Sequence, residues 1–295
     1  MCQDKGWPFS FLQLALLGCY DRSRGTRIMR LNKERVRLRF SRAAGTYDQQ
    51  AMVQLQVADH LVQLLEENVT PSPAQIMEIG CCTGLLTERL SKLYPQLKAL
   101  FVNDLVPDFA PVVGKRLNND PRLHYLAGDI EHIDIPQDLD LVASSSTLHW
   151  LEDLPALLKK LHQCIVPGGS LCFSIYGSQN LREVREVTGV GLDYLSREGL
   201  QNLVADYFDI ISCSEDLIPL HFSDPLAMLY HLRETGVNAL AETNWTKSRL
   251  DSFLQEYLRR FGSWKIFDHA DWDFSFRAMV SRYRGRVKRF CGRNR

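Results

Sequence analysis

Short apolar segments alternate with longer amphipathic segments between Ala74 and Tyr176. The short segments have the length of buried strands, and the longer ones repeat apolar residues with the period of a helix. This alternation is typical of βαβ units and predicts a parallel sheet. We expect the last helix of the series to end at Pro167-Gly168-Gly169. The predicted strands are Gln75–Ile79, Leu97–Asn103, Arg122–Ala127, Leu139–Ala143 and Ser170–Tyr176, and the predicted helices are Leu85–Leu93, Phe109–Asn118 and Leu154–Ile165.

Amphipathic segments also flank this series. The pattern predicts further helices over Ala51–Leu65, Arg197–Asp206, Pro225–Leu232 and Leu250–Phe261, and strands over Phe208–Cys213, Leu217–Phe222 and Phe274–Tyr283. The simplest assembly is an α/β fold with a seven-stranded, mostly parallel sheet and helices on both faces. A helical insert of about 50 residues precedes its last strand, and the last two strands form an antiparallel hairpin.

These elements divide the chain into five parts. They are an N-terminal extension (1–34), an N-terminal helical lid segment (35–70), the core (71–223), a helical insert or lid (224–270), and the last strand with a basic tail (271–295). The extension contains an apolar stretch, Phe9–Cys19, that is too short to span a bilayer and follows no basic cluster. We expect the extension to be disordered or to precede the true start, for which Met29 is a candidate.

Composition narrows the class of protein. Of the 295 residues, 45% are hydrophobic and 24% are charged, as in soluble globular proteins. The 35 basic and 35 acidic residues balance, which argues against a protein that coats nucleic acid by bulk charge. The eight cysteines include no CxxC pair and no His at zinc-finger spacing, so we expect no metal site and a cytoplasmic location.

A glycine-rich turn follows the first strand of the series and opens the next helix. Residues 78–84 read EIGCCTG, with Glu78, Gly80 and Gly84 at fixed spacing. Glycines at such a turn let the backbone pass close to a ligand. The pattern ExGxxxG differs from the GxGxxG of dinucleotide-binding proteins. Taken alone, it is as typical of an ordinary strand-to-helix turn as of a ligand site.

Two further acids end the next two strands. Asp104 stands about 20 residues beyond the last glycine, where a carboxylate can accept both hydroxyls of a ribose. Asp129, followed by Ile130, ends the third strand, where it can accept from an exocyclic amine. Because the carboxyl ends of parallel strands share one edge of the sheet, the three groups together predict a site for an adenosine-shaped ligand.

This constellation resembles the class I S-adenosylmethionine-dependent methyltransferases, whose pattern is E/DxGxGxG followed by acids after the second and third strands. Cys82 stands at the middle glycine of that pattern, and we expect its side chain to crowd the methionine part of the cofactor. The resemblance implies a Rossmann-like fold and S-adenosylmethionine as cofactor. The cofactor-binding residues it implies are Gln54, Glu78, Gly80, Cys82, Gly84, Asp104, Asp129 and Ile130.

The segments outside the core identify a particular family within this class more specifically than the glycine turn does. Residues 40–48, FSRAAGTYD, with Gln54, are similar to the FSRAAxxYDxxAxxQ signature of the biotin-pathway malonyl-acyl-carrier-protein O-methyltransferases. Residues 144–151 and 222–239 also resemble segments of that family. The resemblance implies methylation of the free carboxyl of a malonyl thioester on an acyl carrier protein, in biotin biosynthesis.

The implied chemistry needs little beyond positioning. A methyl sulfonium is an activated donor, and a malonyl carboxylate is ionised at neutral pH, so we expect catalysis by proximity without a general base. Candidates for holding the carboxylate are Tyr47, His149 and Arg233. Alternatively, Tyr47 is an aromatic group that closes the site, His149 is a residue of the cleft wall, and Arg233 is a solvated charge on a helix.

The distribution of charge along the chain bears on the partners of the protein. Basic residues at both ends of the chain, among them those of the stretch Arg35–Arg42, would steer an acidic carrier protein and would attract RNA equally well. No RNA-binding domain is apparent, so we expect neither a nucleic-acid nor a membrane partner, and we leave the oligomeric state open. One rival is a methyltransferase of this fold that acts on another small acid or a quinone-like molecule. The other, motivated by Cys82, is a cofactor-binding interaction protein without turnover.

Overall fold

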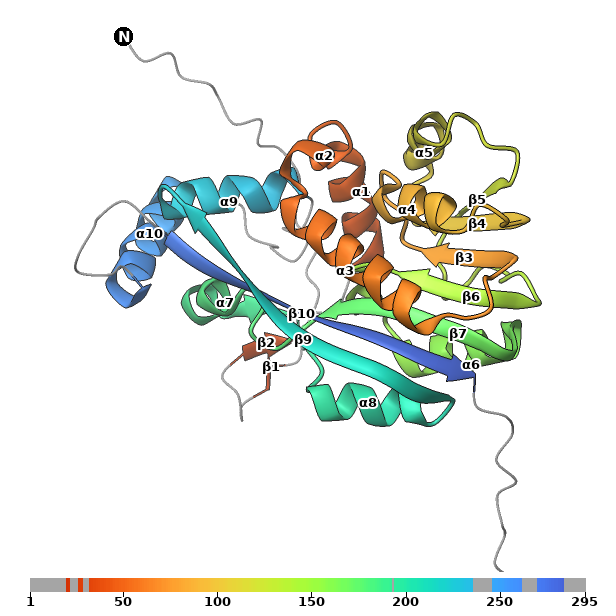
Figure 1. The fold of residues 1–295 in the computed structure, drawn as a ribbon. Coiled ribbons are helices and arrows are strands. Elements are labelled where there is room, and N and C mark those ends of the chain that lie inside the picture. Colours follow the sequence, from red (N-terminus) through yellow and green to blue (C-terminus); the bar gives the residue numbers. More distant parts are fainter. Residues whose placement is uncertain are drawn as a thin grey trace, which may run out of the picture.

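A seven-stranded sheet forms the centre of the computed structural model, which describes residues 20–21, 26–28, 32–192, 194–235, 246–261 and 270–283. Its strand order is β5-β4-β3-β6-β7-β10-β9 (Figure 1). Strands β5 to β7 pair in parallel, and β10 pairs antiparallel with both β7 and β9. The predicted seven-stranded, mostly parallel sheet is therefore confirmed. The strands are β3 (Gln75–Ile79), β4 (Ala99–Asp104), β5 (Leu123–Ala127), β6 (Leu139–Ser144), β7 (Ile165–Tyr176), β9 (Phe208–Phe222) and β10 (Ala270–Tyr283).

Helices cover both faces of this sheet. Apolar residues of α3 and α4 pack in one buried cluster, and those of α6 and α8 pack in another that contains alternate residues of the same strands. Strands buried on both faces are nearly continuously apolar, which explains why the pattern predicted them well. The helices of the two faces are α3 (Met52–Asn68), α4 (Leu85–Leu93), α5 (Ala110–Arg116), α6 (Leu154–Cys164) and α8 (Arg197–Ala205).

Shorter elements lie around this core. Helices α1 (Lys33–Ala43) and α2 (Tyr47–Gln50) precede α3, and α7 (Arg182–Thr188) follows β7. Two short 3-10 helices, η1 (Pro107–Phe109) and η2 (Leu148–Trp150), follow β4 and β6. A separate small sheet joins β1 (Tyr20–Asp21), β2 (Thr26–Ile28) and β8 (Val190–Gly191).

Most predicted bounds differ from the structure by a few residues, and two differences are larger. The segments predicted as separate strands, Phe208–Cys213 and Leu217–Phe222, belong to the single strand β9. Its polar middle, residues 214–216, stays paired with β10, because β9 is an outer strand of the sheet and can expose polar side chains to solvent. Helix α6 ends at Cys164, so Pro167-Gly168-Gly169 lies within the first residues of β7.

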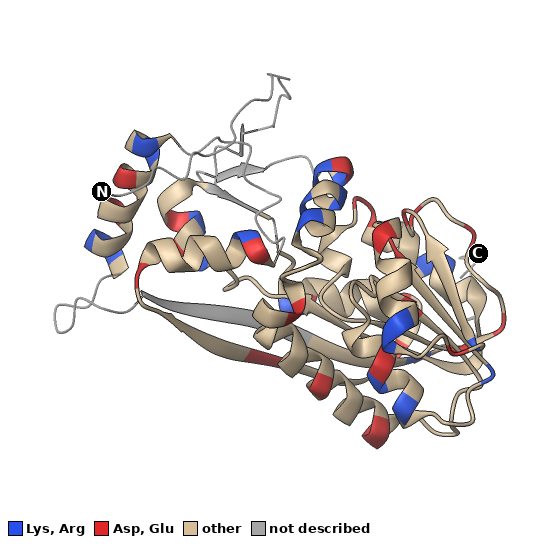
Figure 2. Ribbon diagram, turned by 90° about the horizontal axis from the view of Figure 1, so that it is seen from above, with Lys and Arg blue, Asp and Glu red and all other residues tan. Residues whose placement is uncertain are grey.

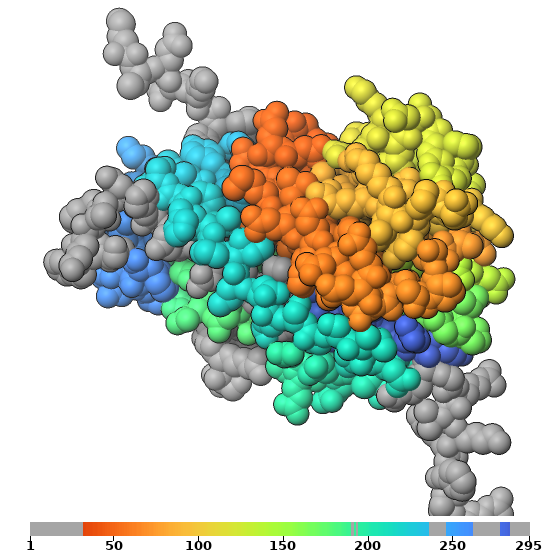
Figure 3. Space-filling view, viewed as in Figure 1, coloured from red at the N-terminus to blue at the C-terminus, as the bar shows by residue number. Residues whose placement is uncertain are grey.

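The insert between β9 and β10 packs against the N-terminal helices. It contains α9 (Pro225–Glu234) and α10 (Lys247–Phe261). The hydroxyl of Thr46 donates to the backbone carbonyl of Glu234 at 3.1 Å, which joins the start of α2 to the end of α9. Figure 3 shows these two parts of the chain side by side, the N-terminal helices in orange and α9 in cyan. None of the helices in the described ranges combines the length and the apolar character of a membrane span.

Candidate active site

The glycine turn between β3 and α4 is fixed by contacts that exclude a side chain at Gly80. Gly80 has a φ of +75°, and a Cβ at this position would lie 2.1 Å from the hydroxyl oxygen of Thr147. The backbone amides of Gly80 and Cys81 donate to the carbonyl of Asn103 at 2.8 and 3.0 Å. The turn is therefore attached to the end of β4, and its backbone is held open toward the cleft.

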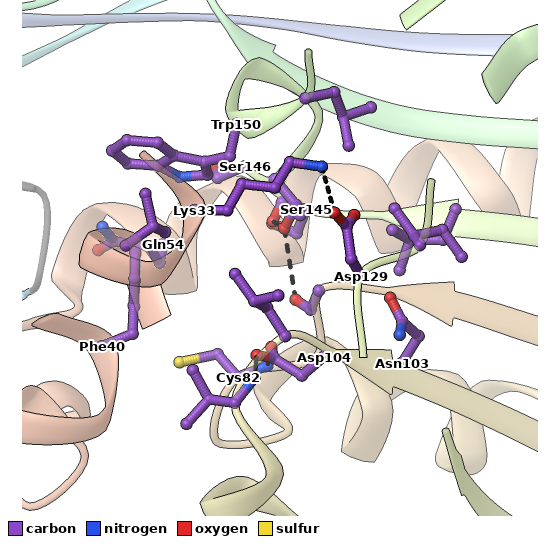
Figure 4. Close-up of a pocket in the computed structure, with 18 of the residues that line it drawn as sticks. Lys33, Phe40, Gln54, Cys82, Asn103, Asp104, Asp129, Ser145, Ser146 and Trp150 are labelled. Carbon is purple, nitrogen blue, oxygen red and sulfur yellow. Dashed lines mark hydrogen bonds and ion pairs between the residues drawn. The ribbon is translucent and has the colours of Figure 1, made fainter. Parts of the chain in front are cut away.

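Cys82 occupies the next strained position of this turn. Its φ of +47° lies in the left-handed region, which favours glycine. The backbone amide of Cys82 donates to Oδ2 of Asp104 at 2.8 Å, while its sulfur points toward the side of the cleft formed by α1 (Figure 4). Burial raises the pKa of the Cys82 thiol well above its usual value. The turn ends at Gly84, which has a φ of +88° and precedes α4.

Asp104 lies on the floor of the cleft. Its carboxylate is buried and accepts two backbone hydrogen bonds, one from Cys82 on Oδ2 and one from Val106 on Oδ1 at 2.9 Å. Burial raises its pKa to about 6, an effect that the hydrogen bonds from the two amides only partly oppose. Each carboxylate oxygen keeps acceptor capacity for a further donor, as the two hydroxyls of a ribose require.

Asp129 lies on the wall of the same cleft and forms an ion pair. Its Oδ2 contacts Nζ of Lys33 at 2.6 Å and Nδ1 of His132 at 3.0 Å. Lys33 also contacts the carboxylate of Glu131. Burial opposes ionisation of Asp129, but hydrogen bonds from Lys33, Glu131 and His132 outweigh it and lower the pKa of the carboxyl. Next to this pair, the buried side chain of Ile130 contributes an apolar surface to the cleft.

A smaller cavity adjoins the cleft behind the glycine turn. Tyr47, Gln54, Gly80 and Cys82 line both spaces, and Glu78 lines the smaller one. Burial raises the pKa of Glu78 to about 8, so this carboxyl is protonated at neutral pH. Within the described ranges, Oε2 of Glu78 and Oε1 of Gln54 are buried without a hydrogen-bond partner. Two unsatisfied polar atoms at one place indicate that a polar ligand completes the site.

The cleft is partly open to solvent, and the space between its walls, including the open part, is about 850 Å³. The apolar part of its lining comes mainly from α1 and from the loop after β6. Phe40 packs edge-on against Trp150, with ring centroids 6.0 Å apart, and tilted against Tyr47 at 6.3 Å. Helix α1 thus covers the cleft and is held there by aromatic contacts.

The three residues proposed from the sequence to hold a substrate carboxylate have different positions. Tyr47 lines the cleft, and burial raises the pKa of its hydroxyl well above its usual value, so the group remains a hydrogen-bond donor. His149 stacks on Tyr176 with ring centroids 4.3 Å apart and does not line the cleft. Arg233 lies over the ring of Tyr230 at 4.8 Å and contacts Glu234, outside the described lining.

Burial also fixes the charge of His149. It lowers the pKa of the imidazole to about 3, so the ring is neutral at physiological pH. Neither ring nitrogen has a hydrogen-bond partner within the described residues. A neutral imidazole can still donate one hydrogen bond, but it supplies no positive charge to a carboxylate.

Several lining residues were missed from the sequence. Lys33 is the clearest, because its charge meets Asp129 only through a contact between residues 96 positions apart. Phe40 belonged to the quoted signature, yet nothing in the signature assigned it to the cleft. Thr235, at the end of α9, reaches the cleft from the insert. The others are Val36, Ile79, Asn103, Leu105, Val106, Gly128, Ser145, Ser146, Thr147, Trp150, Leu151 and Tyr176.

Three features define a Rossmann-like fold of the class I methyltransferase type. They are the strand order with its antiparallel seventh strand, the glycine turn after β3, and the buried acid at the end of β4. Solved structures share this fold: a protein from Bacillus halodurans C-125 superposes with a TM-score of 0.57 at 13% identity, covering 75% of this chain and 97% of that one. The YcgJ protein from Bacillus subtilis gives 0.53 at 11% identity, covering 77% and 100%.

Sequence comparison identifies the family. Residues 77–173 match the model of the methyltransferase domain. A malonyl-(acyl-carrier protein) O-methyltransferase from Bacteroides helcogenes is 34% identical, with 79% of this chain and 92% of that protein covered. One from Bacteroides thetaiotaomicron is 36% identical, with 78% and 92% covered. The chain therefore belongs to the family of these proteins, within the S-adenosylmethionine-dependent methyltransferases. The predicted enzyme class and cofactor are confirmed.

The residues of the cleft fit this cofactor. Asp104 offers acceptors for the ribose hydroxyls, Asp129 and Ile130 offer a polar and an apolar contact for the adenine, and Gln54 offers an unsatisfied oxygen next to the glycine turn. When bound, the cofactor supplies an activated methyl group. The assignment of individual side chains to parts of the cofactor, and the crowding predicted at Cys82, stay predictions.

Proposed function

We propose that this enzyme methylates the free carboxyl of a malonyl thioester carried by an acyl carrier protein, a step of biotin biosynthesis. The observation that carries the proposal is the similarity to curated malonyl-(acyl-carrier protein) O-methyltransferases, at 34% and 36% identity over most of both chains. The N-terminal signature at residues 40–54, which lies in α1 to α3, belongs to the parts of the chain that cover the cleft.

The chemistry of the lining supports a carboxylate acceptor. The two acids that line the described cleft, Asp104 and Asp129, are both held by hydrogen bonds, and the imidazole of His149 lies outside it. A phenol or alcohol acceptor must lose a proton during transfer, whereas a malonyl carboxylate is already ionised at neutral pH. With Asp129 paired to Lys33 and Asp104 placed to accept from the cofactor, the described lining offers no further carboxylate or imidazole as a base, which suits a carboxylate acceptor better than an alcohol.

Tyr47 is the group that we propose for holding the acceptor beside the methyl donor. It is buried and lines the cleft at the glycine turn. The protonated hydroxyl of Tyr47 can donate to a carboxylate oxygen, and the aromatic cover from α1 and Trp150 excludes water around it. Removing water strengthens such a hydrogen bond and leaves the carboxylate more reactive.

The test is mass spectrometry of malonyl-carrier protein incubated with the enzyme and S-adenosylmethionine. We expect a gain of one methylene mass on the malonyl group, and no gain on acetyl-carrier protein, which lacks the free carboxyl. Asp104→Ala is the matched inactive control. Failure of folded, cofactor-binding enzyme to modify malonyl-carrier protein, together with methylation of free acids or phenols, would favour the rival acceptor. Tight cofactor binding without any product would favour the rival without turnover.

A further inference from the structure

The outer side of α1 carries a cluster of arginines, of which Arg42 is exposed and Arg35 and Arg39 are partly buried. Arg35, Leu38, Arg39 and Arg42 follow one another at helical spacing and therefore share one side of the helix. The opposite side carries Lys33, Val36 and Phe40, which line the cleft. Helix α1 is thus the wall between the cleft and this surface, which we call the basic face of α1.

The positive charges of the basic face are not neutralised by the described part of the chain. Arg35, Arg39 and Arg42 take part in no ion pair among the described residues, whereas Arg37, on the flank of the same helix, pairs with Glu34 at 2.6 Å. Burial lowers the pKa of Arg39, and the neighbouring charges of Arg42 and Arg35 lower it further. Figure 2 shows the blue bands of Lys and Arg along this helix. Three cations that repel one another favour an anionic partner.

An exposed leucine interrupts the charges. Leu38 is 42% exposed and lies between the arginines on the same side of α1. An apolar centre surrounded by charged groups is the usual composition of a protein–protein interface. A polyphosphate backbone offers no apolar counterpart for this side chain, so the combination favours an acidic protein over a nucleic acid.

We propose that the basic face of α1 is the docking surface for the acidic carrier protein that presents the malonyl thioester. This inference rests on the proposed function and names the surface that the function uses. A carrier protein bound there lies against the helix whose other side lines the cleft, so its flexible acyl arm has a short path to the glycine turn. Charge attraction at this surface would raise the association rate most strongly.

The experiment compares two acceptors and two charge-reversal variants. The test variant is Arg35→Glu/Arg42→Glu. The control, Lys247→Glu/Arg249→Glu, makes the same charge change at exposed positions of α10, at the far side of the insert in Figure 1. We expect the test variant to raise KM for malonyl-carrier protein about tenfold or more, with kcat and the KM for malonyl-pantetheine unchanged. Leu38→Ala should raise the same KM by a smaller factor. Unchanged cofactor affinity in each variant confirms the fold.

Binding of the carrier protein itself, measured without turnover, separates this inference from the proposed function. Weaker binding by the test variant but not by the control supports docking on α1. Equal binding by both, or an equal rise of KM for both acceptors, overturns it. If the wild-type enzyme methylates malonyl-pantetheine but neither binds nor methylates malonyl-carrier protein, docking is refuted while carboxyl methylation stands. If it methylates neither acceptor, the proposed function fails, and the binding measurement still decides on the docking surface.

Discussion

The floor and the wall of the cleft hold their acids in different ways. Asp104, on the floor, is fixed by the amide of Cys82 in the glycine turn and by the amide of Val106 just after β4, and burial raises its pKa to about 6. Asp129, on the wall, contacts Lys33 at the start of α1, and its pKa is lowered. The floor is thus built by segments of the core alone, whereas the wall includes a contact to the N-terminal cover.

This difference implies that Asp104 and Asp129 contribute differently to cofactor binding. The acceptors of Asp104 are in place whenever the sheet is folded, because the backbone donors, Cys82 and Val106, belong to the turns that follow β3 and β4. The environment of Asp129 depends on α1, because Lys33 neutralises it only while α1 covers the cleft. We therefore expect loss of the floor acid Asp104 to reduce cofactor affinity strongly, and loss of the wall acid Asp129 or of its partner Lys33 to reduce it weakly.

The substitution Asp104→Asn should have the largest effect. It preserves shape but removes the charge that strengthens hydrogen bonds to two hydroxyls, so we expect cofactor affinity to fall about 100-fold. Calorimetric titration with S-adenosylmethionine measures it. Asp129→Asn is the matched control, for which we expect a loss of less than about tenfold. Equal losses in the two variants would show that floor and wall do not differ as described.

Acidification should reproduce part of that effect without a mutation. The cofactor hydroxyls need an ionised acceptor, and the pKa of Asp104 is about 6, so the competent form is lost as the pH falls through this value. Between pH 7 and pH 5 we expect affinity to fall about tenfold. Titrations at several pH values should show the same slope in Asp129→Asn and a flat profile in Asp104→Asn. A slope that persists in Asp104→Asn assigns the titration to another group.

The substitution Lys33→Met tests the wall directly. It removes the charge that joins α1 to Asp129 and Glu131 while keeping an unbranched chain, so we expect a loss of stability of about 1 kcal/mol. Cofactor affinity should fall only a few-fold. Urea denaturation with and without cofactor measures both effects. The exposed pair of Lys92 with Glu88 offers the control Lys92→Met, for which we expect almost no change. A Lys33 variant as stable as this control would mean that the ion pair does not hold α1.

The smallest effect is expected for Cys82→Gly on the floor. Glycine relieves the cost of a φ of +47°, and we expect a gain of stability of up to about 1 kcal/mol. Cofactor affinity should stay equal or improve a few-fold, because the side chain that would crowd the methionine part is removed. Asn118→Gly is the control, since Asn118 is exposed on the surface with a φ of +53°. It should change stability alone. A loss of affinity in Cys82→Gly would show that the thiol assists binding.

The floor could be predicted from the sequence because its signals are local. Gly80, Gly84 and Asp104 follow predicted strands. The sequence patterns that predict the strand, the turn and the next helix lie within a few residues of each other. The wall could be predicted only in part, because Asp129 and Ile130 follow a predicted strand but the partner of Asp129 lies far away in the sequence. Lys33 was assigned to an extension, and only the packing of α1 brings it to Asp129. Thr235 likewise reaches the cleft from an insert whose position no local pattern specifies.

The sequence-based prediction was least successful for the side-chain directions of His149 and Arg233. His149 follows β6 at the edge where ligands bind, which made it a candidate for substrate contact, but its ring lies against Tyr176 and is neutral. Arg233 has the charge that a carboxylate needs, but its side chain lies over Tyr230. The sequence identifies which residue types stand near the strand ends, whereas the direction of each side chain depends on neighbours from distant segments.

The hydrogen bond from Thr46 to the end of α9 has a consequence for how such enzymes diversify. It joins the N-terminal helices to the insert between β9 and β10, two segments far apart in the sequence that both reach the cleft. Substitutions in these two segments can alter which acceptor enters, whereas the glycine turn and Asp104, which we assign to the donor, belong to the core. Acceptor choice can therefore change with only a small effect on donor binding.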